Sequence, residues 1–162
     1  MLVRTTSNHR RRTLRRPPPT VITLAVVLFL LAIGALQGGV AMVVNPLDPL
    51  GMSPDFLERA PVDDYFWPGV FLLGIATASL STIPGLLLQW SWPWAHATEK
   101  MIGYRWPWLA SVAIGALLLV FELIELVMVP FHPVMHPLLI AVSLVVLLLP
   151  FTRTTRAHLR SR

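Results

Sequence analysis

Residues 107–129 read PWLASVAIGALLLVFELIELVMV, a run of 23 residues in which only Glu122 and Glu125 are charged. At about 1.5 Å per residue, a helix of this length crosses a hydrocarbon core of roughly 30 Å. The whole chain of 162 residues is 55% hydrophobic and 13% charged, with a mean hydropathy of +0.67. Soluble domains contain about 25% charged residues. The stretch therefore predicts a membrane-spanning helix in an integral membrane protein.

Three other apolar runs accompany this one, at 21–44, 66–90 and 134–151. The first two carry no charged residue and are long enough to span a bilayer. The last is shorter and reaches a useful length only if its helix begins near Val134, with Pro137 in the first turn, where proline is tolerated. We therefore expect an all-α fold, an integral membrane four-helix bundle over residues 21–151. A disordered basic arm (1–20) should precede it and a basic tail (152–162) should follow it.

The charges are distributed unevenly along the chain. Ten of the 13 lysines and arginines lie in the two terminal segments, whereas the loop at 45–65 carries five acidic residues and one arginine. Four spans place both termini on one side of the membrane and the acidic loop on the other, which satisfies the positive-inside rule. We expect a multi-pass protein of the bacterial plasma membrane with cytoplasmic termini. Its basic tails should contact anionic lipids rather than nucleic acid.

Small residues spaced four apart occur in the first three spans. Such pairs let helix backbones approach closely in a membrane. The pairs predict packing within the bundle in preference to dimerisation, and they are Gly34 with Gly38, Gly74 with Ala78, and Ser111 with Gly115.

The two glutamates share a helical face with the small residues of their span. Residues three or four apart lie on one face of a helix, so Ser111, Gly115, Glu122 and Glu125 form one stripe. The stripe should face the bundle interior, in the half of the membrane nearer the acidic loop. A carboxylate at that depth is costly unless it has a partner. We expect hydrogen bonds to Gln37, to hydroxyls or to water, or a shared proton or a bound cation.

Three interpretations of these carboxyl groups compete: a buried polar cluster, a proton or cation pathway, and a metal site completed by His132 or His136. Carboxylate and imidazole ligands suit zinc, manganese or iron. The HExxH, G-x-S-x-G, P-loop and dinucleotide motifs are absent, however, and the chain contains no cysteine. We therefore expect no cofactor and a non-enzymatic accessory or interaction subunit that binds another membrane protein or a second copy. The alternatives are a small proton- or cation-coupled transporter that uses Glu122 and Glu125, and a membrane-embedded metalloenzyme.

The stretch NPLDPLGMSPDFLERAPVDDYFWPG, residues 45–69, contains a distinctive end. Pro61 closes the loop, Asp64-Tyr65 follows, and Pro68-Gly69 opens the second span. In these features the chain resembles an uncharacterised group of small four-helix integral membrane proteins of actinobacteria, from which it departs at Val62, where an aromatic residue is expected. The resemblance implies the four-span topology and the membrane location, and it brings no active site with it.

Overall fold

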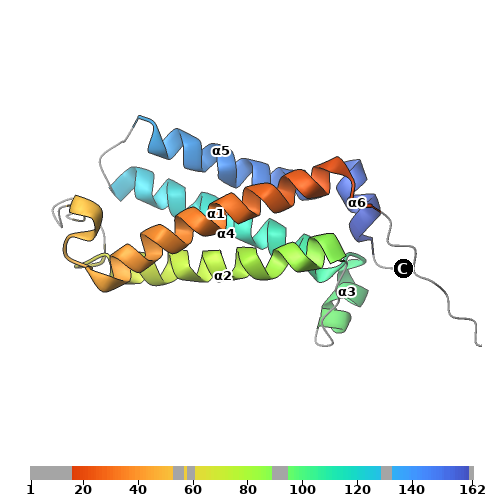
Figure 1. Cartoon of the computed structure of the whole chain (residues 1–162), viewed down its shortest axis with the longest axis horizontal. Helices are drawn as coiled ribbons and strands as arrows, with labels where there is room; N and C mark the ends of the chain where they lie inside the picture. The colour runs from red at the N-terminus through yellow and green to blue at the C-terminus, as the bar shows by residue number, and fades with distance from the viewer. Residues whose placement is uncertain (1–15, 53–56, 58–60, 89–94, 129–132, 161–162) are drawn as a thin grey trace, which may run out of the picture.

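Four long helices form an up-and-down bundle in the computed structural model, which describes residues 16–52, 57, 61–88, 95–128 and 133–160 (Figure 1). They are α1 (Pro19–Val44), α2 (Phe66–Leu88), α4 (Trp106–Met128) and α5 (Met135–Leu148). The all-helical class predicted from the sequence is thereby confirmed. Three of these helices are long and apolar enough to cross a membrane, and α5 with its continuation can supply a fourth crossing.

The starts of the helices follow from local chemistry. Helix α1 begins at Pro19 directly after the extended Pro18, since proline is suited to the first helical turn. At α2, the backbone N–H of Phe66 donates to the Asp64 carboxylate at 2.9 Å. At α4, the backbone N–H of Trp106 donates to Glu99 of the short helix α3 (His96–Ile102) at 3.0 Å. Carboxylates are favourable at both positions because the first N–H groups of a helix lack partners and carry positive charge.

The helices pack as two antiparallel pairs. Helix α1 contacts α2 most extensively and α4 contacts α5, while α2 and α4 join the pairs. The core between them consists of aliphatic side chains, among them Leu24, Leu28, Leu86, Leu118 and Val146, which are almost completely buried.

The closest backbone approaches occur at glycines. A Cβ atom added at Gly115 would lie 2.6 Å from the backbone nitrogen of Leu147, and one at Gly39 would lie 2.9 Å from the carbonyl oxygen of Gly69. The predicted packing residue Gly38 has an ordinary contact, 3.5 Å from Leu72 to a built Cβ. Helix α1 therefore approaches α2 most closely at Gly39, one residue after Gly38 of the predicted pair.

Three predicted packing residues point out of the bundle. Cβ atoms built at Gly34 and Gly74 would meet no atom within 4 Å outside their own helices. Ala78 is exposed as well. These positions do not contribute to close contacts within the described chain, because the buried face of each helix runs along other residues.

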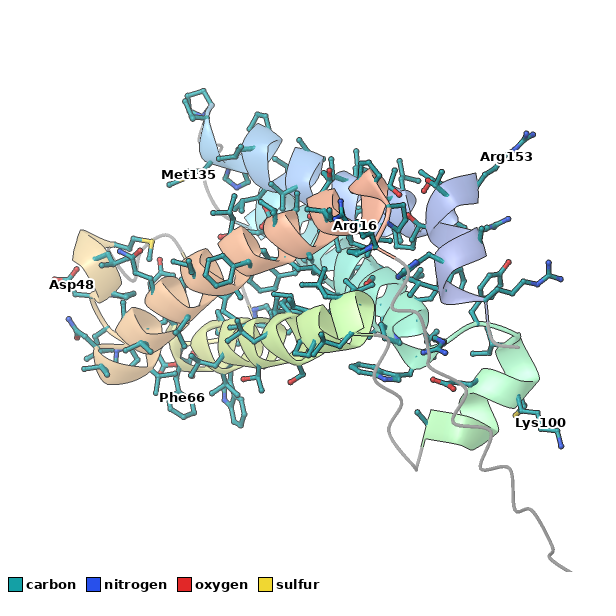
Figure 2. All side chains as sticks on the ribbon, turned by 45° about the vertical axis from the view of Figure 1, so that its right-hand side comes forward. Arg16, Asp48, Phe66, Lys100, Met135 and Arg153 are labelled. Atoms are coloured by element: carbon teal, nitrogen blue, oxygen red, sulfur yellow. The ribbon has the colours of Figure 1, made fainter. Side chains whose placement is uncertain are left out.

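The two ends of the bundle differ in charge. Figure 2 shows Lys100 and Arg153 at one end, which we call the basic end, and Asp48 and Met135 at the other, which we call the acidic-loop end. The acidic-loop end contains the short helix η1 (Pro49–Gly51), in which Leu50 has a φ of 56°.

The basic end is closed by a helix within the segment expected to be a tail. After the short helix η4 (Leu149–Phe151), the chain turns by 62° into helix α6 (Arg153–Leu159). Thr155 and Leu159 of α6 are buried. The Thr155 hydroxyl donates to Thr20 of α1 at 3.0 Å. The backbone N–H of Arg105 donates to Leu159 at 2.8 Å. This part of the C-terminal segment is therefore docked on the bundle, since its threonines and leucine have partners there.

Candidate functional site

Glu122 and Glu125 lie near the acidic-loop end of α4. Glu122 is only 2% exposed, and Glu125, one turn further along, is partly buried. Ser111, Gly115 and Leu118 are buried on the same stripe of α4, so the face defined by the 3.6-residue period is the one that packs into the bundle. The neighbouring Phe121 stacks on Phe71 of α2, with ring centroids 4.7 Å apart.

Two further titratable side chains accompany the glutamates. Tyr65, immediately before α2, and His136, in the first turn of α5, are each 5% exposed. Glu125 interacts electrostatically with both of them and with Glu122. Three segments that are distant in sequence thus bring together Tyr65, Glu122, Glu125 and His136, which we call the Glu122 cluster. Burial, and then the negative charge of Glu125, raise the pKa of Tyr65 above its ordinary value of 10.0.

The Glu122 carboxyl is incompletely hydrogen-bonded. Its Oε2 atom is buried and has no hydrogen-bond partner among the described residues. The buried hydroxyls of Thr82, Ser111 and Ser143 each donate to the carbonyl four residues earlier in their own helix, at 2.7, 2.8 and 2.6 Å. An unsatisfied buried oxygen costs about 1–3 kcal/mol, and more if it is charged. A neutral, protonated carboxyl is therefore the form that this environment favours.

Gln37, the partner expected from the sequence, is not part of the cluster. Its side chain is exposed on α1, where it lines a shallow groove with Ile33, Val40 and Leu50. The buried face of α1 runs through Leu28, Leu31, Ala32, Ala35 and Gly39. Gln37 lies off this face, and so the predicted pairing is wrong.

Metal binding was the remaining interpretation of these carboxyl groups. Within the described ranges, no three histidine, aspartate or glutamate side chains are placed to share a metal ion. His132, a predicted ligand, lies outside the described residues, whereas His136 is brought next to Glu125.

Tyr65 belongs to the loop motif noted in the sequence, but its residue type alone does not predict that it joins this cluster. The order of the helices could have predicted that Tyr65 lies near Glu125. In an up-and-down bundle, the start of α2 and the end of α4 lie at the same end.

The proximity of Tyr65 and Glu125 can be tested by titration. In a Tyr104→Phe background, which leaves Tyr65 as the one tyrosine of the chain, Glu125→Gln should lower the pKa of Tyr65. The substitution removes a negative charge that disfavours tyrosinate, while burial keeps the pKa above 10.0. Tyrosinate absorbance measured during alkaline titration reports the shift. Asp63→Asn, at an exposed position two residues before Tyr65, is the control, and equal shifts in both variants would contradict the placement.

The cluster can bind and pass protons, because carboxyl, imidazole and phenol groups all exchange them. Its members come from the start of α2, the end of α4 and the start of α5. The chain matches no protein-family model, no curated protein and no solved structure.

Proposed function

We propose that this protein is a multi-pass protein of the bacterial plasma membrane and a non-enzymatic accessory or interaction subunit. Its partner is another membrane protein or a second copy. Both termini are cytoplasmic in this proposal. The gathering of Lys100 and Arg153 at one end and Asp48 at the other supports that orientation (Figure 2). The likeness of its acidic loop to small actinobacterial four-helix proteins also supports the membrane location.

The observation that carries the proposal is the exposure of Gln37 on α1. At about 1.5 Å per residue, this amide lies roughly 10 Å inside the end of the helix at Val44. Thr77 and Ser81 are also exposed, but each hydroxyl donates to a carbonyl of its own helix at 2.8 Å. Gln37 has no such bond among the described residues. An amide in hydrocarbon therefore gains a hydrogen bond when a partner helix covers it.

The surface around Gln37 suits a helix. The groove is lined by Ile33, Leu36, Gln37, Val40, Ala41, Val44, Asn45 and Leu50. Gly34 lies beside it, one turn from Gln37, and a Cβ there would meet nothing within 4 Å. Small residues next to a polar one are typical of membrane helix interfaces. A second helix can thus approach α1 closely and reach the amide.

Site-specific photo-crosslinking in native membranes tests this function. A photoreactive amino acid at Ile33, which lines the groove and is 49% exposed, should yield a protein adduct, whereas the same probe at Val120, which is 54% exposed on α4, should react with lipid. Gln37→Leu should reduce the adduct by roughly fivefold, because one membrane hydrogen bond contributes about 1 kcal/mol.

The matched control is Thr77→Val, which removes an exposed hydroxyl that already has a partner in its own helix. It should leave the adduct yield unchanged. An adduct with the mass of two chains identifies a homodimer, and a different mass identifies another protein. Lipid adducts alone at Ile33 would contradict the proposed function.

A further inference from the structure

We propose that the Glu122 cluster is a proton-binding site in which Glu122 carries the exchangeable proton, and that the site opens towards the acidic-loop end. This inference is independent of the interaction surface on α1, because the two sets of residues share no member. It is also distinct from transport, since it requires access from one end only.

The burial of Glu122 is the first reason. With 2% of its surface exposed and Oε2 without a partner among the described residues, the side chain is enclosed by the bundle and lacks a protein donor at that atom. Transferring an ionised carboxylate into such surroundings is far more costly than transferring the acid. Two carboxyl groups one helical turn apart can in addition share one proton. Glu122 therefore holds the proton while Glu125 carries the charge.

The surrounding groups favour a proton over a metal ion. The titratable side chain that interacts with Glu122 is Glu125 of α4, which in turn interacts with Tyr65, immediately before α2, and with His136 of α5. Helix α1 contains no titratable residue between Pro19 and Val44. The described residues offer no trio of metal ligands. Each member of the cluster can instead donate or accept a proton.

The direction of access follows from the depth of the residues. Glu125 is more exposed than Glu122 and lies one turn closer to the acidic-loop end. Towards the basic end, Glu122 is followed on its face by the buried Leu118 and Ile114. The hydroxyls of Ser111 and Ser143 beyond them are bonded to their own helices. A proton released by Glu122 is taken up by the Glu125 carboxylate, which leaves Glu122 ionised and Glu125 neutral. Glu125 then releases the proton to water at the acidic-loop end and becomes ionised again.

Infrared difference spectroscopy between acidic and alkaline pH tests the site. The full chain is reconstituted in phosphatidylcholine–phosphatidylglycerol vesicles. The wild type should lose a carbonyl band of a protonated, buried carboxyl group on alkalinisation, and Glu122→Gln should lack that band. The exposed controls Asp48→Asn and Asp63→Asn should retain it. Persistence of the band in Glu122→Gln, or its absence in the wild type, would overturn the proposal.

Three further measurements test the neighbouring charge, the ligand and the access of the site, and none depends on the folding of Glu122→Gln. In Glu125→Gln the band should remain while its pH midpoint moves, because its nearest charge has been removed. In the wild type, exchange of sodium for choline should leave the midpoint in place, and a cation-dependent midpoint would show a metal ion competing at the site. An entrapped pH dye should report no proton flux above that of empty vesicles. A flux that Glu125→Gln abolishes would overturn the one-ended access.

Discussion

Gly115→Leu should separate α4 from α5 and destabilise the bundle by about 3 kcal/mol, the upper part of the usual range for overpacking. A Cβ at this position lies 2.6 Å from the nitrogen and 2.7 Å from the Cα of Leu147. Both are backbone atoms, so the clash cannot be relieved by rotation of a side chain, and α5 has to move. Because α5 carries His136, the Glu122 cluster should be lost with the interface.

The loss can be measured by reversible unfolding in mixed micelles, with the fluorescence of the six tryptophans as the signal. Gly74→Leu is the matched control, because a Cβ at Gly74 meets nothing within 4 Å. Its effect should stay within about 0.5 kcal/mol, as is usual for surface positions. Equal destabilisation by the two substitutions would contradict the described α4–α5 contact.

Trp108→Ala should cost about 3 kcal/mol by loosening the basic end of the bundle. The indole N–H donates to the carbonyl of Pro150 at 2.9 Å. The ring stacks on Tyr104 at 4.7 Å and contacts Phe151 edge-on at 5.3 Å. One side chain thus joins α4 to the α3–α4 connection and to η4. Its removal should release η4 and, with it, the docked helix α6.

Trp108→Phe separates the two contributions, since it keeps a ring but removes the indole N–H. It should cost about 1 kcal/mol, the usual net value of one hydrogen bond. Trp67→Ala, at a position that is 66% exposed, is the control and should have little effect on unfolding. Accelerated proteolysis after Arg153 in Trp108→Ala, but not in Trp67→Ala, would show that α6 is released. Identical proteolysis of the two variants would refute this role for Trp108.

The long apolar helices and one buried helical face were predictable from residue types. Length and hydropathy define α1, α2 and α4, because a bilayer of fixed thickness demands long apolar helices. On α4 the small and acidic residues mark the inward face, and Ser111, Gly115 and Glu122 are indeed buried. These residues differ in polarity and size from their exposed neighbours, and so their period can be read in the sequence.

The rotation of α1 was not predictable in this way. Its buried Leu28 and Leu31 and its exposed Leu30 and Leu36 are the same residue type, and lipid solvates such side chains as well as a helix bundle does. Hydrophobicity therefore assigns no inward direction, and the placement of Gln37 and of the Gly39 contact had to come from packing.

Residue types alone predict that this chain forms apolar helices of membrane length, with charge divided between two ends and two carboxyl groups within one apolar helix. Which groups meet those carboxyls depends on the packing of the helices. Tyr65 and His136 reach Glu125 because α2 and α5 begin where α4 ends, and such contacts between distant segments depend on how the helices pack rather than on any local pattern.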